Sequence, residues 1–216
     1  MPMNRKAELV AAGRKLLEKG LTVETWGNIS LRDPDSGLIY LTPSAMAYDT
    51  ITEEDVVVMD ADGRVVEGFR KPTVEAEMHL SILRRRPEIH AVIHTHPIDS
   101  LVFGVLRRDI PPIIDEAAQA LGGTVRTAEY ALPGTPELAR NAVAALGDRG
   151  MACLLANHGA VCLGRSMDQA FKTAAVLEMT ARVYRMALAI GEPQLIGEEE
   201  VAWMKDFADR RYGQDK

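Results

Sequence analysis

Two short turn sequences near the start of the chain limit its fold more than any other feature. Both are rich in Asp, and each includes a glycine and separates two apolar runs; they are Asp33-Pro34-Asp35-Ser36-Gly37 and Asp60-Ala61-Asp62-Gly63. Such turns between short apolar runs are typical of β-hairpins. We therefore predict paired strands over 28–31 and 38–41, and again over 56–59 and 64–66. Two early hairpins favour a largely antiparallel sheet over a strict series of parallel strands.

Helical periodicity accounts for much of the remaining chain. Asn4 can cap a first helix, whose apolar residues fall at helical spacing and which Gly20 ends. Further helices are predicted over 136–146, 167–190 and 198–211.

The segment between these helices contains both kinds of element. Thr73 can cap a helix with Glu75 and Glu77 in its first turn, where the helix dipole favours anions. Ala91-Val92-Ile93 predicts a short buried strand, and one or two strands are expected within 153–163.

This order of elements favours an α/β fold in which helices flank a mainly antiparallel sheet, because hairpins stand beside helices without strict strand–helix–strand alternation. No linker-like Gly/Ser/Pro stretch and no internal repeat divides the chain, so we expect a single domain over residues 1–216. A domain of 216 residues can bury a sizeable core without disulfides or a structural metal.

Composition excludes several classes of protein. Apolar residues make up 47% of the chain and charged residues 26%, as in globular domains. No run approaches the roughly 18 apolar residues that span a membrane, and the polar start predicts no signal peptide. The net charge of −6 argues against nucleic acid as a partner. Cys153 and Cys162 form no CxxC motif, so we expect both in the core of a cytoplasmic protein that binds no membrane.

Three of the five histidines could share a metal ion. His94 and His96 follow the predicted strand 91–93, and residues two apart in an extended chain project from the same face. His158 lies between two apolar runs, next to a glycine that permits a sharp turn. Three neutral imidazoles would form a Zn²⁺ site with an open position, as catalytic zinc requires. A hydrogen-bonded or surface histidine pair has the same spacing, so both interpretations stay open here.

A glutamate could act beside such a metal. Glu75 and His79 lie four residues apart on one helical face, so both can point into a common pocket. A carboxylate near a dication can serve as a general base, although the first turn of a helix favours carboxylates for structural reasons alone.

Two loops offer groups that can bind a phosphate. Trp26-Gly27-Asn28-Ile29-Ser30 provides a glycine, an amide and a hydroxyl, and Leu41-Thr42-Pro43-Ser44-Ala45 provides hydroxyls after a strand. Backbone N–H groups and such side chains can cradle a phosphate, but the same residues also build ordinary turns.

Five segments, taken in this order and spacing, carry a resemblance to a known family. They are Gly27-Asn28-Ile29-Ser30, Thr42-Pro43-Ser44, Lys71-Pro72-Thr73-Val74-Glu75, His94-Thr95-His96-Pro97 and Asn157-His158-Gly159. The chain resembles the class II aldolase family, typified by L-fuculose-1-phosphate aldolase, which also contains L-ribulose-5-phosphate 4-epimerase and the adducin head domain. The resemblance spans nearly the whole chain. It implies an α/β/α sandwich, a Zn²⁺ ion, and a homotetramer with active sites between subunits.

The resemblance also implies residue roles. His94, His96 and His158 match the zinc ligands, and Glu75 matches the catalytic acid/base. The dipeptides matching those that hold the substrate phosphate are Gly27-Asn28, Ser44-Ala45 and Thr73-Val74. Tyr212, followed by Gly213, resembles a tail tyrosine that reaches a neighbouring subunit's site and can protonate the aldehyde oxygen. Mn²⁺ or Co²⁺ could take the place of zinc.

The chain departs from the family pattern around the substrate. Ala45 stands in place of a glycine, and Val74 in place of a serine, so one hydroxyl contact to phosphate is lost or passes to a backbone N–H. Glu116 and Pro133 stand where fuculose-phosphate aldolases have a tyrosine and a phenylalanine.

The implied reaction is cleavage of a ketose 1-phosphate to dihydroxyacetone phosphate and an aldehyde. The candidate substrates are L-fuculose 1-phosphate, 5-deoxyribulose 1-phosphate and 5-methylthioribulose 1-phosphate.

Other functions share parts of this pattern. The family's epimerases characteristically have an aspartate where this chain has Glu75. A sugar-acid phosphate decarboxylase would use the same three histidines, and a non-catalytic adducin-like binding module shares the fold but lacks them. Cupins and metal-dependent hydrolases also use His-x-His pairs. Cupins are all-β, in contrast to the helical periodicity here, whereas a hydrolase would act on esters or amides.

Overall fold

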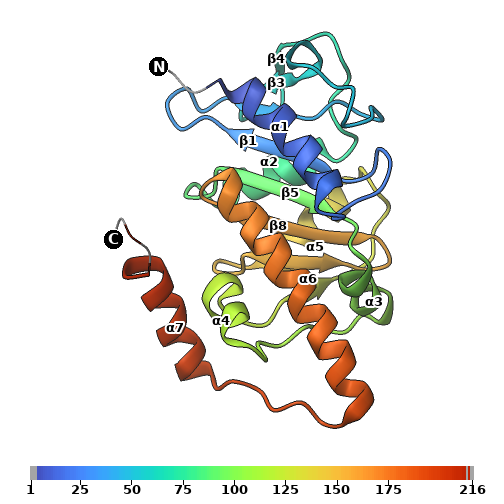
Figure 1. Ribbon diagram of the computed structural model, residues 1–216. Coiled ribbons are helices and arrows are strands. Elements are labelled where there is room, and N and C mark those ends of the chain that lie inside the picture. Colours follow the sequence, from blue (N-terminus) through green and yellow to red (C-terminus); the bar gives the residue numbers. More distant parts are fainter. Residues whose placement is uncertain (1–3, 213, 215–216) are drawn as a thin grey trace.

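The computed structural model describes residues 4–212 and 214, and it forms one sheet with helices on both faces (Figure 1). Residues 1–3, on which the signal-peptide prediction partly rests, and Gly213 lie outside the described residues. The strands are β1 (Asn28–Arg32), β2 (Ile39–Leu41), β3 (Val57–Met59), β4 (Val65–Glu67), β5 (Ala91–Thr95), β6 (Arg126–Ala128), β7 (Ala152–Leu155) and β8 (Gly159–Gly164). Their order across the sheet is β4-β3-β2-β1-β5-β8-β7-β6.

Neighbouring strands are antiparallel except for the parallel pair β6–β7. Both predicted hairpins are present, since Ser30 pairs with Leu41 and Met59 pairs with Val65. The prediction of an α/β fold with a mainly antiparallel sheet is confirmed.

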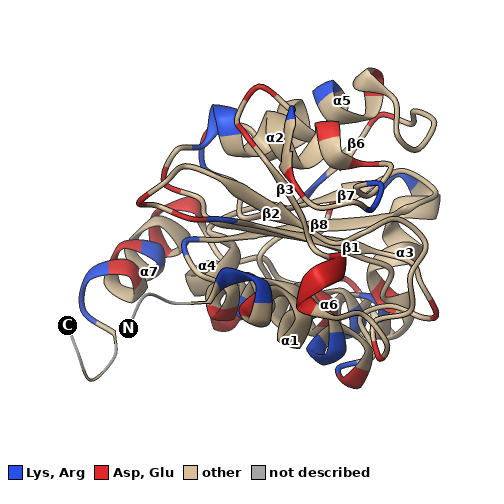
Figure 2. Ribbon diagram, turned by 90° about the horizontal axis from the view of Figure 1, so that it is seen from above, with Lys and Arg blue, Asp and Glu red and all other residues tan. Residues whose placement is uncertain are grey.

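The helices form a layer on each side of the sheet. They are α1 (Arg5–Glu18), α2 (Ala76–Arg85), α3 (Ile98–Leu106), α4 (Asp115–Leu121), α5 (Pro136–Leu146), α6 (Met167–Ile190) and α7 (Glu198–Arg210), with a 3-10 turn, η1, at Glu53–Asp55. Figure 2 shows α2 and α5 on one face, and α1, α4 and α6 on the other. Helix α7 packs on α4, and α3 packs on α6. None of the helices in the described part of the chain has the length and apolar character needed to cross a bilayer.

Successive side chains of the central strands point to opposite faces of the sheet, so the sheet separates two hydrophobic cores. On β5, Ala91 and Ile93 face the core beneath α1 and α6, while Val92 faces the core beneath α2 and α5. Because helices cover both faces of the sheet, most residues of β5, β7 and β8 are apolar. Cys153 and Cys162 are buried with free thiols in opposite cores, as expected of packing residues.

The start of α2 differs from the prediction. Thr73 does not cap the helix: its Oγ1 accepts a hydrogen bond from the Glu75 N–H (3.4 Å), and its carbonyl accepts one from the Ala76 N–H (3.1 Å). These bonds form a turn that delays the helix until Ala76, with Glu75 at the N-cap position. The placement of Glu75 in the first helical turn was therefore wrong. Glu75 is buried beside the sheet, whereas Glu77 occupies the first turn and is exposed.

Candidate active site

Three histidines converge at one end of the central strands. His94 and His96 lie at the end of β5, and His158 lies in the turn from β7 to β8. Their ring centroids are 4.6 Å (His94–His96), 4.8 Å (His94–His158) and 5.3 Å (His96–His158) apart. One ligand nitrogen from each ring lies within 4.8 Å of the other two. The structure therefore brings together all three histidines that the sequence predicted as metal ligands.

Two glycines permit this close approach of the strands. A Cβ on Gly159 would lie 2.4 Å from the Thr95 carbonyl oxygen and 2.9 Å from His94 Cε1. Gly27 has a φ of +72°, and a Cβ there would lie 2.6 Å from the His94 carbonyl oxygen. Any larger residue at either position would push β1 or β8 away from β5.

The imidazoles are in the form that a metal requires. His94 Nδ1 lies 2.9 Å from the Ala160 carbonyl oxygen, which can only accept, so Nδ1 carries the proton and Nε2 has a free lone pair. That Nε2 lies 2.9 Å from His96 Nε2. Burial is the main cause that lowers the pKa of His96 to about 3 and that of His158 to about 4. Neutral rings at pH 7 offer lone pairs to a cation.

The donor set fits a divalent cation of the zinc type. Glu75 Oε1 and His158 Nδ1 are buried and have no hydrogen-bond partner within the described part of the chain. Unpaired buried polar atoms cost about 1–3 kcal/mol each, so a site that leaves them unpaired is suited to binding a cation or a polar substrate.

The Glu75 carboxylate lies directly beside the histidines. Its Oε2 accepts a hydrogen bond from Asn28 Nδ2 (2.8 Å) and lies 3.3 Å from His94 Nε2, while Oε1 lies 3.5 Å from His158 Nε2. Burial raises the pKa of Glu75, but its interaction with His94 and the hydrogen bond from Asn28 outweigh burial, and the pKa falls below its ordinary value. The carboxylate is thus ionised at neutral pH and able to accept a proton.

The three dipeptides matching a phosphate site also lie together. Thr42 joins them, because its Oγ1 accepts from the Ile29 N–H (3.1 Å) and its carbonyl accepts from the Thr73 N–H (3.1 Å). The dipeptides are Gly27-Asn28 at the start of β1, Ser44-Ala45 after β2, and Thr73-Val74 before α2. Ala45 has a φ of +54°, so the backbone there keeps the left-handed conformation that favours glycine. Val74 is exposed.

Two side chains at this end of the sheet had no role in the sequence analysis. The Tyr48 hydroxyl donates to the Gly27 carbonyl (2.7 Å) from a buried position, and it steadies the loop that enters β1. Trp26 is exposed and stacks on His96, with ring centroids 6.3 Å apart and planes at 16°. The only signal for Trp26 was its place beside Gly27, and Tyr48 had none.

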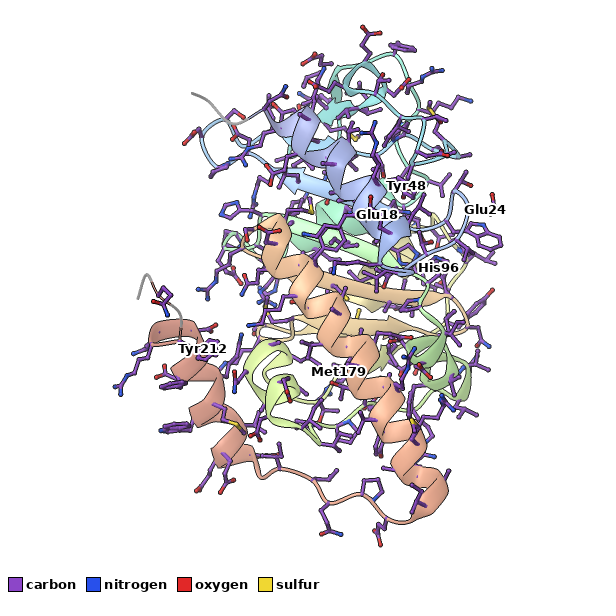
Figure 3. All side chains as sticks on the ribbon, viewed as in Figure 1. Glu18, Glu24, Tyr48, His96, Met179 and Tyr212 are labelled. Carbon is purple, nitrogen blue, oxygen red and sulfur yellow. The ribbon has the colours of Figure 1, made fainter. Side chains whose placement is uncertain are left out.

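Tyr212 is not brought to the histidines of its own chain. Figure 3 shows Tyr212 and His96 on opposite sides of the molecule. The Tyr212 ring lies 6.3 Å from that of Phe207 and 5.9 Å from Lys172 Nζ. Glu116 is an exposed residue of α4, the helix on which α7 packs. Tyr212 therefore lies too far from the histidines to complete this site within one subunit.

The chain matches one known protein family over most of its length. Residues 7–185 match the model described as "Class II Aldolase and Adducin N-terminal domain". The chain belongs to this family.

Several of the similar proteins are named as aldolases. The chain is 39% identical over 196 residues to a 5-deoxy-D-ribulose 1-phosphate aldolase of Bacillus thuringiensis, covering 91% of each chain. It is 39% identical over 193 residues to a 5-methylthioribulose-1-phosphate/5-deoxyribulose-1-phosphate aldolase of Rhodospirillum rubrum, covering 89% of this chain and 86% of the other. A solved structure titled L-fuculose 1-phosphate aldolase is 40% identical with a TM-score of 0.91, covering 95% of this chain and 97% of that one.

Family membership and the histidine triad together identify an enzyme of the class II aldolase type, as the sequence predicted. The eight-stranded sheet between helix layers, formed by the described residues, is not the all-β fold of a cupin. Within this family, the triad separates the chain from the non-catalytic, adducin-like modules, which the sequence analysis expected to lack it.

Proposed function

We propose that this class II aldolase cleaves a ketose 1-phosphate reversibly to dihydroxyacetone phosphate and an aldehyde. The substrate is a 5-deoxyribulose, 5-methylthioribulose or L-fuculose 1-phosphate. The observation that carries this proposal is the Glu75 carboxylate, 3.3 Å from His94 and 3.5 Å from His158, at a site where three neutral imidazoles converge. The names of the relatives support the substrate class.

The residues divide the chemistry among them. His94, His96 and His158 hold the divalent metal, which is zinc in this proposal, with Mn²⁺ or Co²⁺ as substitutes. The bound metal supplies Lewis-acid polarisation of the substrate oxygens. Glu75 removes and returns the proton on the dihydroxyacetone phosphate carbon that forms the new bond.

The phosphate is held by the three dipeptides around Thr42. Backbone N–H groups and the hydroxyls of Ser44 and Thr73 can donate to it, and the Asn28 amide keeps one N–H beyond the one it gives to Glu75. Because Val74 has no hydroxyl, only the backbone N–H at this position can donate a hydrogen bond to the phosphate. Fixing the phosphate holds the reacting carbon near Glu75 and the histidines.

The enzyme acts as a homotetramer in this proposal, and Tyr212 of a neighbouring subunit completes the site. Helix α3, which begins two residues after His96, exposes Ile98 and Leu106, and α6 exposes Ile190 at its end. Exposed apolar surface of this kind is typical of subunit interfaces. Light scattering tests the assembly, and a monomer at working concentration would contradict it. The buried free thiols of Cys153 and Cys162 support a reducing cytoplasmic location.

A panel of aldehydes condensed with dihydroxyacetone phosphate tests the reaction. We expect condensation with lactaldehyde or a related short aldehyde, its loss with a chelator, and its return when zinc is added. Cleavage of the matching ketose 1-phosphates then ranks the substrates. Activity that a chelator leaves intact, or no condensation with any aldehyde, would contradict the proposal.

A further inference from the structure

A row of buried polar side chains leads away from Glu75 into the protein. Ser30 Oγ lies 2.7 Å from His79 Nδ1, His79 Nε2 lies 2.5 Å from Asn28 Oδ1, and Asn28 Nδ2 lies 2.8 Å from Glu75 Oε2. Ser30 and His79 are 0% exposed. An apolar side chain would pack at position 79 without the cost of desolvating an imidazole. The reaction described above uses Glu75 and leaves His79 without a part.

The fold places this row by two short-range rules. Asn28 and Ser30 are two residues apart on β1 and therefore project from the same face. His79 lies one helical turn after Glu75, and its N–H donates to the Glu75 carbonyl (3.3 Å). One strand and one helix start thus bring four polar groups into line.

Each hydrogen bond in the row can run in only one direction. The Glu75 carboxylate can only accept, so Asn28 must present its NH₂ group to Glu75 and its oxygen to His79. His79 must then carry its proton on Nε2 to donate to that oxygen. Its Nδ1 is left bare and accepts from the Ser30 hydroxyl.

His79 and the Glu75 carboxylate therefore hold the Asn28 amide in one orientation from its two sides. The oxygen and nitrogen of an amide have almost the same shape, so packing alone does not distinguish its two orientations. The reversed amide would place an oxygen against the Glu75 carboxylate. The carboxylate disfavours that arrangement, and the Nε2–H of His79, which needs an acceptor, disfavours it as well.

This fixed direction makes the two oxygens of Glu75 unequal. Oε2 is bound by Asn28, whereas Oε1 is buried without a hydrogen-bond partner among the described residues. We propose that His79 is a positioning residue, which through Asn28 holds Glu75 so that Oε1 is the oxygen that exchanges a proton with substrate. The inference rests on the proposed function, in which Glu75 moves that proton.

Deuterium exchange into dihydroxyacetone phosphate by the metal-loaded enzyme tests the inference. In His79→Leu the exchange rate should fall about 10- to 100-fold, the usual range for a partner that orients a functional group. Metal content should stay within about twofold, and the fall in kcat should exceed any rise in KM, because Asn28 also offers an N–H to the phosphate. His79→Gln, which keeps a donor and an acceptor at this position, should recover most of the rate.

Thr173→Val is the matched control. Thr173 is as deeply buried, and its hydroxyl donates to the Leu163 and Gln169 carbonyls (3.0 Å each), but it has no link to Glu75. The exchange rate of this variant should stay near that of the wild type. An equal loss in Thr173→Val and His79→Leu would mean that general destabilisation is the cause, and would overturn the inference.

Nitrogen-15 NMR of the histidines in the wild-type enzyme provides a readout that depends on neither activity nor the folding of a variant. We expect a proton on Nε2 of His79 and none on Nδ1, with the signal assigned by its absence from His79→Gln. The opposite tautomer would overturn the inference. Wild-type enzyme without exchange would overturn the proposed function and the inference with it, whereas exchange that His79→Leu leaves unchanged would overturn only the role of His79.

Discussion

The metal-binding end of the sheet and the C-terminal helix α7 hold their functional side chains in different ways. At the metal end, Glu75 and His94 are buried and bonded to groups of the same chain, and Gly27 and Gly159 leave no room for another residue. On α7 and beyond, Trp203 and Tyr212 are exposed, and their ring contacts run to Phe207.

This difference separates what one chain completes from what an assembly must add. The histidines and the glutamate reach their arrangement within a single subunit, because three strands and a helix start fix them. Tyr212 gains a function only if a second subunit supplies the surface that it faces. Variants at the metal-binding end of the sheet and variants of helix α7 should therefore lose activity for different reasons.

The largest effect is expected from the metal ligands. His94→Ala, His96→Ala and His158→Ala should each lose the metal and all measurable cleavage, because two imidazoles and water rarely hold zinc at micromolar levels. The fold should persist, since the side chains lie at strand ends rather than within either core. Metal analysis and circular dichroism of the purified variants check this. A variant that keeps one zinc per chain and normal turnover would remove that histidine from the site.

Glu75 and Glu77 provide the next test, because they lie two residues apart with opposite exposure. Glu75→Gln should keep the metal but slow proton exchange into dihydroxyacetone phosphate by about 10²- to 10⁴-fold, the range of a lost general base. Glu77 Oε1 accepts from Ser81 Oγ and Arg84 Nη1 (3.0 Å each) at the surface. Glu77→Gln should therefore cost less than about 1 kcal/mol of stability and leave exchange unchanged. Similar losses in both variants would contradict the assignment of Glu75.

The contrast between the two ends also explains what the sequence could predict. The His94–His96 pair followed from the two-residue period of a strand, which is a local property. His158 was added to the pair only through the resemblance of the chain to a family. Helices α5 and α6 have the predicted bounds, because Thr135 and Ser166 cap them and their apolar periodicity is long. Helix α4 and strand β6 were not predicted, since seven and three residues are too few to show a period.

Other features depended on contacts between distant parts of the chain. Thr73 looked like a helix cap, but its carbonyl and N–H are used in a turn that also bonds to Thr42. The hydrogen bond from Tyr48 to Gly27 joins residues 21 positions apart, and no local sequence pattern predicts it. The donors and acceptors in the row of hydrogen bonds from Ser30 to Glu75 could be assigned only once the interatomic distances were known.

A truncation at the C-terminus tests the role of helix α7 and Tyr212. Truncation after Phe207 removes Tyr212 and the last turn of α7, and it should leave the oligomer and its metal intact. Turnover with aldehydes should fall by about 10²-fold, the scale of one lost general acid, and Tyr212→Phe should reproduce most of the loss. Steady-state kinetics with several aldehydes provides the measurement. Full turnover by the truncated enzyme would show that the tail is only a chain end, and that the metal end suffices.

The smallest effect concerns strain at the metal end, where Ala45 has a φ of +54°. A left-handed conformation costs a residue with a Cβ about 1–2 kcal/mol, and glycine avoids this cost but loses more entropy on folding. Ala45→Gly should therefore raise the free energy of unfolding by up to about 1 kcal/mol. Ala47→Gly in the same loop, where φ is not positive, should lower it by about 0.5–1 kcal/mol. Urea unfolding of both metal-loaded variants at one protein concentration measures the difference. Opposite signs would show that Ala45 carries backbone strain in the turn next to the expected phosphate, whereas a loss of stability in both would show that this turn accommodates alanine without strain.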